Sequence, residues 1–470
     1  MDSDVDLYLR VWASARDAAT AAAREVADES GHEFAKAIAD ACRADVSADT
    51  LHASFEKVAE LIFAGRGAED IGASPEHKLL RDSLRGFARD RIAPFAQDVH
   101  RRDADVPEHI ISGVAEMGLF GLSIPVQYGG QLDGSSDAKA MLIATEELSA
   151  ASLAAGGSLM TRPEILVSAL LRAANEEQKQ RWLPVIASGE KLVAVAITEP
   201  DYGSDVAGIT CRAVRASDGS WIVNGTKLWC TFAGRANLLS VLCRTTPDPG
   251  HRGLSLFVLE KPPFGGHEFE HRQEGGGTLR GHAIPTIGYR GMHTFELVFE
   301  DYRLPSDALV GTEGQGFYLQ MEGFATGRLQ TAGRAVGVMH AAVRDTLAYT
   351  TQRNVFGRPV ADQPLARTLL GRMAVRLHAS RALSYQAAAS IDSGVGQVHA
   401  ALAKLYASRM AEFVTRDAMQ LFGGMGYGEE TDVSRYFLDA RVLAIFEGAE
   451  EVLALKVIGR AIDAAPTSQP

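Results

Sequence analysis

The spacing of hydrophobic residues changes twice along the chain. Up to about residue 192, apolar side chains recur every three to four positions, as in residues 51–62, which is typical of helices with one buried face. Between about residues 193 and 305 the period falls to two, and residues 295–299 alternate as in a strand with one buried face. After Pro305 the helical period returns and continues to about Ile462.

This order of helices, then strands, then helices predicts an α+β fold. Strands and helices do not alternate, so a doubly wound parallel sheet is not expected. The chain should divide into a helical extension and linker at 1–72, a helical domain at 73–192, a β domain at 193–305, a second helical domain at 306–463 and a polar tail at 464–470.

Local signals mark the ends of several elements. Ser74-Pro75 has the N-cap residue and the first-turn proline of a helix start. Asp218-Gly219 and Asn224-Gly225 are each flanked by strand-forming residues and predict two β-hairpin turns. Glycines at 65, 67 and 72 indicate the linker after the extension.

Composition and charge exclude several classes of protein. With 46% hydrophobic and 23% charged residues, the 470-residue chain has the make-up of a globular protein. A net charge of −12 argues against a nucleic-acid surface. The chain has no apolar run of about 18 residues, so we expect no membrane span. The acidic N-terminus does not resemble a signal peptide, and the four scattered cysteines predict a reducing, cytoplasmic location and no metal site.

Glu447 is the first candidate for chemistry. It follows Ala444, Ile445 and Phe446, and Gly448 after it lets the backbone approach a ligand closely. A carboxylate between apolar residues can be desolvated, which raises its pKa and suits it to remove a proton from carbon. The alternative is a helix cap or an ion pair with a nearby arginine such as Arg441.

Two blocks in the β region are candidates for holding a flat polar ligand. Residues 196–208 form a loop rich in hydroxyl groups and glycine, whose main-chain N–H groups could meet such a ligand. Residues 227–231 place Trp229 beside Thr231, an aromatic plane next to a hydroxyl. A simple turn and ordinary packing of a tryptophan in the sheet are the alternatives.

Two further blocks lie among the C-terminal helices. Arg353 and Arg358 flank Gly357, an arrangement suited to a pyrophosphate, although a polar loop between helices would look the same. Residues 420–428 contain four glycines within six positions, more than a helix end requires.

Together and in this order, these blocks resemble the acyl-CoA dehydrogenase family from about Pro75 to Ile462. Residues 117–130 are similar to the family's N-terminal signature, and residues 299–305 are similar to the exit from its middle domain. The resemblance implies an N-terminal helical domain, a middle antiparallel β domain and a C-terminal four-helix bundle. It also implies bound FAD and α,β-dehydrogenation of an acyl-CoA thioester to the 2-enoyl-CoA.

The resemblance assigns Glu447 as the base that removes the α-proton while the flavin takes the β-hydride. The main-chain N–H of Glu447 would help to polarise the thioester oxygen. Some branches of the family carry the base immediately before the arginine at position 328. That position is Gly327, which cannot be a base, so Glu447 is the only candidate.

Further roles are implied residue by residue. Thr198 and Thr231 would bond the flavin edge, and Trp229 would lie against the ring. Ser204 is similar to a residue beside the cofactor and substrate. The substrate side would also include Arg328 and Phe446.

The resemblance implies a homodimer or homotetramer, because some residues would complete the FAD site of a neighbouring subunit. These residues are Arg353, Phe356, Gln420 and Gly424. An electron-transfer flavoprotein is the implied electron acceptor.

The chain departs from the family pattern in several places. Phe446 replaces the usual tyrosine, and Ala449-Glu450 replaces the usual Thr-Ser, which removes a hydroxyl and adds a charge. Residues 1–72 precede the usual start, and we expect them to form an extra helical layer over apolar surface. Gly265–Gly281 enlarges a loop with basic residues, either as a solvated excursion or to attract an acyl carboxylate or CoA phosphates.

The extension, the sequence Ile287–Met292 and the Phe446–Ala449 version of the glutamate motif together resemble the methylsuccinyl-CoA dehydrogenase branch. This resemblance implies a short branched or dicarboxylic acyl-CoA, such as methylsuccinyl-CoA, as the substrate. Other functions stay open at this point. They are a flavin-dependent acyl-CoA oxidase or monooxygenase of the same fold, and a non-catalytic binding protein. The acidic charge disfavours a DNA-binding member, and Glu447 disfavours an inactive one.

Overall fold

The computed structural model describes residues 2–30, 33–43, 48–64, 74–134, 136–248, 250–393 and 396–464. The chain divides into two compact units. We call residues 1–97, 138–157 and 328–470 the helical unit, and residues 98–137 and 158–327 the sheet unit. The glycines of the predicted linker and residues 465–470 of the predicted tail lie outside the described residues.

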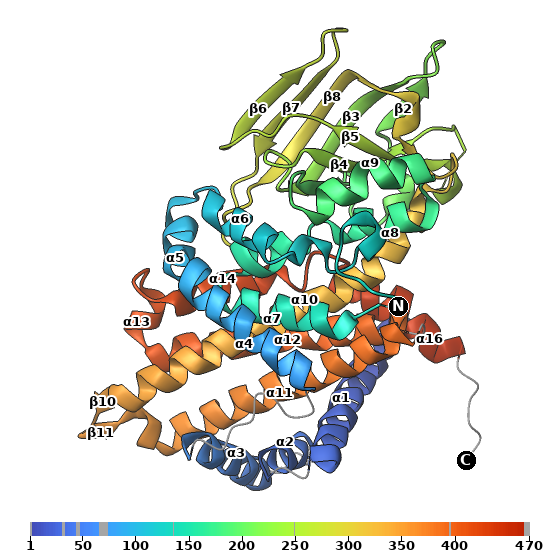
Figure 1. Ribbon diagram of the computed structural model, residues 1–470. Coiled ribbons are helices and arrows are strands. Elements are labelled where there is room, and N and C mark those ends of the chain that lie inside the picture. The colour runs from blue at the N-terminus through green and yellow to red at the C-terminus, as the bar shows by residue number, and fades with distance from the viewer. Residues whose placement is uncertain are drawn as a thin grey trace. The chain divides into compact units, whose positions relative to one another are not determined.

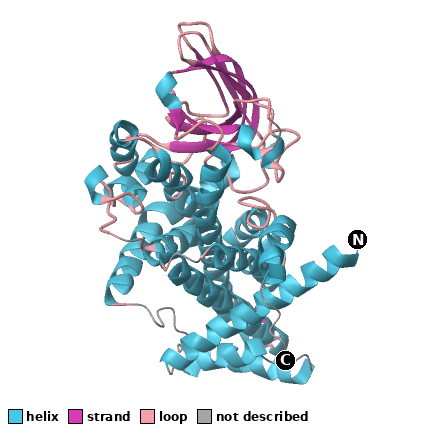
Figure 2. Cartoon of the chain, turned by 90° about the vertical axis from the view of Figure 1, so that its right-hand side faces the viewer, coloured by secondary structure: helices cyan, strands magenta, loops and turns pink. Residues whose placement is uncertain are grey.

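The helical unit consists almost entirely of helices (Figures 1 and 2). Its elements are α1 (Asp2–Ser30), α2 (Glu33–Arg43), α3 (Ala48–Phe63), α4 (Pro75–Phe87), η1 (Ala88–Ile92), α7 (Ala138–Ala151), α11 (Pro364–Asp392), α12 (Gln397–Phe422), α13 (Gly424–Tyr427), α14 (Asp432–Val442), α15 (Glu450–Val452), η9 (Leu453–Ile458) and α16 (Gly459–Ala464). A short hairpin of β10 (Asn354–Val355) and β11 (Arg358–Pro359) precedes η8 (Val360–Asp362) and α11. The division between the units falls inside α5 (Ala93–Arg102), η4 (Leu153–Ser158) and α10 (Gly316–Gln352).

The N-terminal extension is part of the helical unit. Phe34 on α2 and Phe55 and Val58 on α3 are buried in one cluster with Ala374 and Val375 of α11. Burial of apolar area on this scale is the main force that fixes an amphipathic helix. The cluster confirms the expectation of an extra helical layer over apolar surface.

Buried ion pairs join the inner helices of the same unit. Arg81 on α4 donates to Glu147 on α7 at 2.8 Å, and Arg381 on α11 is paired with Glu146 on α7. Burial alone would raise the pKa of Glu146, but Arg381 and Arg81 lie alongside and hold it well below its usual value. Removing one partner from such a group leaves a buried charge, so these pairs fix how α4, α7 and α11 pack.

The sheet unit is built around one nine-stranded sheet, visible as the curled magenta layer in Figure 2. Its strands are β1 (Val193–Ala196), β2 (Arg212–Arg215), β3 (Trp221–Thr231), β4 (Leu238–Arg244), β5 (Leu254–Glu260), β6 (Glu268–Arg272), β7 (Thr278–Ala283), β8 (Thr294–Leu304) and β9 (Leu309–Val310). They run in the order β6-β7-β8-β3-β2-β4-β5-β9, with β1 beside β4. The pairing is antiparallel except that β1 is parallel to β4 and one residue pair of β2 and β4 is parallel.

Both faces of the sheet are buried over β4 and β5, whereas β6 and β7 bury only the face that carries Phe269 and Leu279. One face has its own core, which includes Phe257, Phe295 and Phe299. The other face packs against α8 (Glu164–Ala173) and α9 (Glu176–Ala187). The sheet unit also contains α6 (Glu108–Glu116) and the short turns η2 (Leu119–Gly121), η3 (Val126–Tyr128), η5 (Val206–Gly208), η6 (His251–Gly253) and η7 (Ser306–Ala308).

Of the two predicted hairpin turns, one is confirmed and one is wrong. Asp218-Gly219 connects β2 to β3. Asn224-Gly225 instead lies inside β3, where the pairing with β8 shifts register between Val223 and Gly225. Gly225 has a φ of 142°, and an added Cβ would lie 2.7 Å from the Cα of Cys211. The glycine is therefore needed for a bulge and a close backbone approach, not for a turn.

The predicted loop at Gly265–Gly281 is mostly a hairpin. Strands β6 and β7 pair over five residue positions. Phe269 and Leu279 alternate with polar neighbours and are buried, and the glycines at 275–277 lie at the turn between the strands. The predicted loop is therefore wrong for most of its length, because these glycines are confined to the turn and the residues around them alternate as in strands.

Gly225→Ala should lower the thermal midpoint by an amount equivalent to about 2–3 kcal/mol, because it combines an unfavourable φ with a steric clash. Gly219→Ala is the matched control: its φ of 86° is also unfavourable, but an added Cβ meets open space. It should cost about 1 kcal/mol. Thermal unfolding followed by circular dichroism compares the two, and equal losses would contradict the close-approach explanation.

Candidate functional site

Glu447 lies on a tight turn between α14 and α15, in the helical unit. Its φ is 56° and that of Gly448 is 100°, so two successive residues adopt positive φ values. A glutamate rarely does so, and such backbone persists only when its surroundings hold it. The turn is closed by hydrogen bonds from the Phe446 N–H to the Val442 carbonyl (3.1 Å) and from the Glu450 N–H to the Ala444 carbonyl (3.1 Å).

Two cationic side chains lie near this glutamate. Burial lowers the pKa of Arg328, and the charge of Glu447 opposes that shift. Lys404 on α12 has an exposed fraction of 0% and donates from Nζ to the carbonyl of Gly448 at 2.6 Å. Burial lowers the pKa of Lys404 to about 7, again opposed by Glu447. Arg441, the alternative partner, pairs instead with Glu412 at 3.2 Å.

Phe446 and Glu450 flank the turn. The guanidinium of Arg334 lies 5.5 Å from the centre of the Phe446 ring, a cation–π distance. Glu450 does not face solvent: it is 4% exposed and accepts hydrogen bonds from Tyr8 and Arg409. The sequence shows the extra charge at position 450 but carries no signal for its partners, which are distant along the chain.

In the sheet unit, a buried ion pair shapes the 196–208 loop. Lys227 on β3 is fully buried, and its Nζ lies 2.7 Å from Glu199 Oε1 and 3.0 Å from the carbonyl of Ile197. The same carboxylate accepts from the backbone N–H groups of Thr210 (2.7 Å) and Cys211 (2.9 Å). The ion pair of Lys227 and Glu199 was not predicted from the sequence. A lysine at an inward-facing strand position and an acidic residue in a neighbouring loop are the signal that could have indicated it.

Trp229 is exposed and not part of the core. Its φ is 59°, and the pairing of β3 with β8 shifts register between Lys227 and Cys230. This bulge turns the side chain out of the sheet, and 56% of the residue is exposed. The N–H of Leu228 donates to the Thr198 carbonyl at 2.8 Å, so the strand carrying Trp229 runs beside the loop that carries Thr198.

Two more predicted residues belong to this part of the sheet unit. The hydroxyl of Thr231 lies 3.1 Å from that of Thr294, at the point where β3 ends and β8 begins. Ser204 is exposed in the irregular loop before η5. The structure therefore brings Thr198 next to the Trp229–Thr231 strand, while Ser204 lies further along the same loop.

Four predicted residues lie in the helical unit, at one end of the long helices. Arg353 and Phe356 belong to the β10–β11 hairpin, and Phe356 is 93% exposed with a φ of 52°. Gln420 and Gly424 are exposed where α12 ends and α13 begins. Tyr349, just before the hairpin, stacks on Phe422 with ring centres 4.1 Å apart, so the two segments are joined.

Three family models match the chain in order. They are the acyl-CoA dehydrogenase N-terminal domain over residues 74–190, the middle domain over residues 194–302 and the C-terminal domain over residues 314–462. The chain belongs to the acyl-CoA dehydrogenase family. The resemblance and the α+β fold expected from the sequence are both confirmed, and the chain is an oxidoreductase of the acyl-CoA dehydrogenase type.

Individual relatives agree with this assignment. The chain is 37% identical to (2S)-methylsuccinyl-CoA dehydrogenase of Cereibacter sphaeroides, over 94% of this chain and 80% of that protein. It is 34% identical to an acyl-CoA dehydrogenase of Bacillus subtilis, over 81% of this chain and 96% of that protein. The structure of butyryl-CoA dehydrogenase from Megasphaera elsdenii is similar with a TM-score of 0.77 at 30% identity, over 84% of this chain and 99% of that chain.

The Cereibacter match covers a larger share of this chain than the Bacillus and Megasphaera matches do. A match over 94% of the chain must extend into residues 1–72, because residues 73–470 make up a smaller share. The extension of this acyl-CoA dehydrogenase is thus partly shared with that relative. Within the described parts of the chain, no helix has the length and apolarity needed to cross a membrane.

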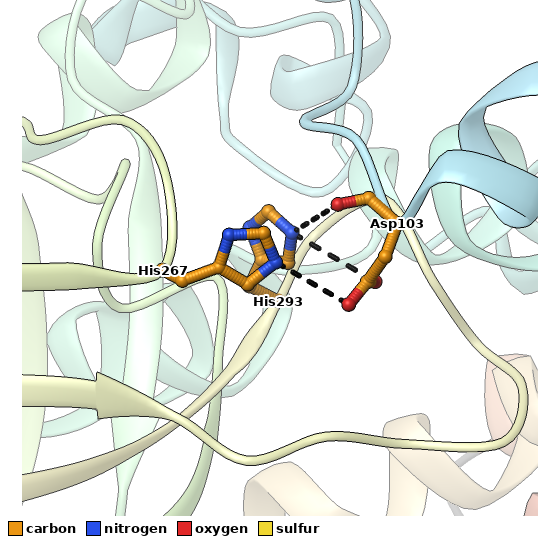
Figure 3. Close-up of side chains that lie close together, drawn as sticks. All are labelled: Asp103, His267 and His293. Atoms are coloured by element: carbon orange, nitrogen blue, oxygen red, sulfur yellow. Dashed lines mark hydrogen bonds and ion pairs between the residues drawn. The ribbon is translucent and has the colours of Figure 1, made fainter.

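The sheet unit of this acyl-CoA dehydrogenase also contains a compact cluster that the sequence analysis did not find. Figure 3 shows Asp103, His267 and His293 side by side. His267 Nε2 lies 3.3 Å from the Asp103 carboxylate, and the two imidazole rings are 4.1 Å apart. Such a set could suggest a metal site.

The hydrogen bonds of His293 favour an ion-pair cluster instead. Its Nε2 lies 3.0 Å from the Asp103 carbonyl and its Nδ1 lies 3.1 Å from the Asp105 carboxylate. Both ring nitrogens therefore face acceptors, which an imidazolium satisfies and a metal-binding imidazole does not. The carbonyl of His293 accepts from the Phe232 N–H at 2.8 Å, so the cluster also anchors the end of the strand that carries Thr231.

This cluster should make stability depend on pH. Burial alone would lower the pKa of His293, but the hydrogen bonds to Asp105 and the Asp103 carbonyl outweigh it and raise the pKa. Because the pKa of His293 is higher in the folded state, its protonation stabilises the protein fully at pH values below the pKa in the unfolded state, about 6.5. This stabilisation is lost as the pH rises through the pKa of the folded state. The Asp105 pKa is lowered, since the His293 contacts outweigh burial, so the contribution of Asp105 is lost in acid.

We therefore expect His293→Gln to destabilise the protein by about 1–3 kcal/mol at pH 6 and by clearly less at pH 9. Thermal unfolding at the two pH values measures the difference. His282→Gln, an exposed histidine paired with Glu268, serves as the control and should show little effect at either pH. A pH-independent loss in His293→Gln would contradict the imidazolium assignment.

Proposed function

We propose that this protein catalyses the α,β-dehydrogenation of an acyl-CoA thioester, with Glu447 as the catalytic base. The observation that carries the proposal is the turn at Glu447, where a carboxylate with a φ of 56° is followed by Gly448 and lies near Arg328 and Lys404. An enzyme that removes a weakly acidic C–H proton needs a carboxylate in a fixed position. The family assignment supports the same reaction.

In this proposal, Glu447 accepts the α-proton of the thioester on its carboxylate. The positive φ turns the Glu447 backbone out of a helical path. In this proposal its N–H polarises the thioester oxygen and stabilises the enolate that develops. Gly448 lets the turn pack closely against Leu453, since an added Cβ would lie 3.0 Å from the Leu453 side chain.

The residues of the sheet unit fit a flavin. Trp229 offers an exposed aromatic face from a bulge, and Thr198 and Thr231 supply hydroxyls from adjacent segments. Bound FAD would supply the acceptor for the β-hydride. Ser204 would lie beside the cofactor and substrate, and Arg328 and Phe446 would contact the acyl-CoA.

We further propose that the active form is a homo-oligomer, either a dimer or a tetramer. Arg353, Phe356, Gln420 and Gly424 would contact the FAD of a second copy. The exposed Phe356 and the open glycines at 423 and 424 support such a role. An electron-transfer flavoprotein is the proposed electron acceptor, and a cytoplasmic location stays a prediction from the sequence.

For the substrate we propose a short branched or dicarboxylic acyl-CoA such as methylsuccinyl-CoA. The support is the relative from Cereibacter sphaeroides, whose match covers 94% of this chain, compared with 81% for the Bacillus match. The sequence Ile287–Met292 and the Phe446–Ala449 version of the glutamate motif also resemble that branch.

Glu447→Gln tests the base. The variant should bind FAD and be purified yellow, because the glutamine preserves the shape of the turn. Acyl-CoA should reduce its flavin about 10²–10⁴-fold more slowly, the usual contribution of a general base. Stopped-flow bleaching of the flavin absorbance measures the rate. Reduction at the wild-type rate would disprove the assignment, and a wild-type protein that never binds FAD would disprove the flavoenzyme proposal itself.

A panel of acyl-CoA thioesters tests the substrate. We expect kcat/KM for methylsuccinyl-CoA to exceed that for butyryl-CoA or hexanoyl-CoA by about 10-fold or more, since a buried polar contact commonly contributes this much to discrimination. Turnover coupled to a dye acceptor measures both constants. Preference for an unbranched monoacyl substrate would exclude the methylsuccinyl assignment and leave the general reaction intact.

A further inference from the structure

The N-terminal helix α1 contacts the segment directly after the candidate base. The hydroxyl of Tyr8 donates to Glu450 Oε1 at 2.6 Å, three residues beyond Glu447. Leu7 packs against Gly459, at the junction of η9 and α16. All these residues belong to the helical unit.

Glu450 has a complete set of partners in this cluster. Arg409 on α12 donates from Nε to Glu450 Oε2 at 3.1 Å, and its second nitrogen pairs with Oε1. Trp12 of α1 lies 5.6 Å from the same guanidinium in a cation–π arrangement. Helix α1 therefore contributes a hydroxyl to the carboxylate and an aromatic face to its cation.

The turn at residues 444–450, which we call the base turn, is thus held on both sides of Glu447. Lys404 bonds the Gly448 carbonyl, and the Tyr8–Glu450–Arg409 cluster fixes the residue that begins α15. Since two successive residues of the turn have positive φ, the local backbone does not favour this path by itself. Each outside contact then reduces the range of positions that the carboxylate of Glu447 can take.

We propose that α1 is a positioning element for the catalytic base, acting through Tyr8 and Glu450. The proposal rests on the function assigned to Glu447 above. It joins two features that look unrelated in the sequence, the N-terminal extension and the glutamate at position 450. Tyr8 is a positioning residue, because it touches the supporting carboxylate and not the reacting atoms.

Tyr8→Phe tests the proposal, because it removes one hydroxyl and keeps the ring. We expect kcat to fall about 5- to 20-fold with KM and FAD content unchanged, as for a small displacement of a reacting group. Amide hydrogen exchange of peptides covering residues 444–453 should become faster in the same variant. Glu450→Gln should act through the same cluster, so the double variant should lose less activity than the product of the single losses.

Glu25→Gln is the matched control. Glu25 is also on α1 and accepts from Gln386 at 2.8 Å, but this contact is remote in sequence from the base turn. It should change neither kcat nor exchange at residues 444–453. Equal losses in Glu25→Gln and Tyr8→Phe would overturn the proposal in favour of general loosening of α1, and so would wild-type kcat and exchange in Tyr8→Phe.

The exchange measurement separates this proposal from the proposed function. If the wild-type protein oxidises no acyl-CoA, the assigned reaction is wrong, and exchange at residues 444–453 still decides whether Tyr8 holds the turn. If the wild-type protein is active and exchange is unchanged in Tyr8→Phe, the reaction stands and the positioning role is wrong.

Discussion

The backbone at Glu447 and Gly448 is the constraint on which the candidate active site depends. Two consecutive positive φ values produce a sharp turn between α14 and α15. The first of them belongs to Glu447, whose Cβ makes this backbone conformation unfavourable. If a helix continued through this point, the Glu447 carboxylate would lie elsewhere and the Glu447 N–H would donate to a carbonyl within the helix. The turn therefore exchanges local stability for a defined position of one side chain, and the helices around it must hold the turn in place.

Buried charge is the means by which both units hold such segments. Lys404 bonds a turn carbonyl in the helical unit, and Lys227 with Glu199 holds the loop after β1 in the sheet unit. In each case the Nζ of a buried lysine meets oxygens that an apolar side chain would leave without a partner. A buried ion is costly to desolvate, so these contacts add little to net stability, but losing one partner is severely penalised. The result is specificity of backbone path at positions where hydrophobic packing alone would tolerate several paths.

Most of the fold follows from the sequence, because its periodicity reports which faces are buried. The helical stretches, the strand at 294–304 and the start of α4 at Ser74 all lie where the pattern predicts them. Asn224-Gly225 was misassigned because a glycine required by a close backbone approach looks identical to a glycine required by a turn. The geometry of the candidate site was only partly predictable. The motifs single out Trp229 and Glu447 as candidates, but the exposure of Trp229 and the φ of Glu447 depend on a bulge and a turn that long-range contacts create. Lys227, Lys404, Tyr8 and His293 escaped notice because their partners are distant in sequence.

The charge at position 450 shows how such distant partners constrain a sequence. A glutamate that is 4% exposed would be strongly unfavourable alone, and Arg409 with the Tyr8 hydroxyl compensates for its lost hydration. In a chain with Glu450 but without α1, the Arg409 pair would remain and the carboxylate of Glu450 would be exposed to water. In a chain with α1 but with a serine at position 450, the Tyr8 hydroxyl would lose this acceptor. The helix and the glutamate are therefore physically one feature, although more than four hundred residues separate them. The effect of a substitution in α1 near Tyr8 therefore depends on the residue at position 450, and the effect of a substitution at position 450 depends on α1.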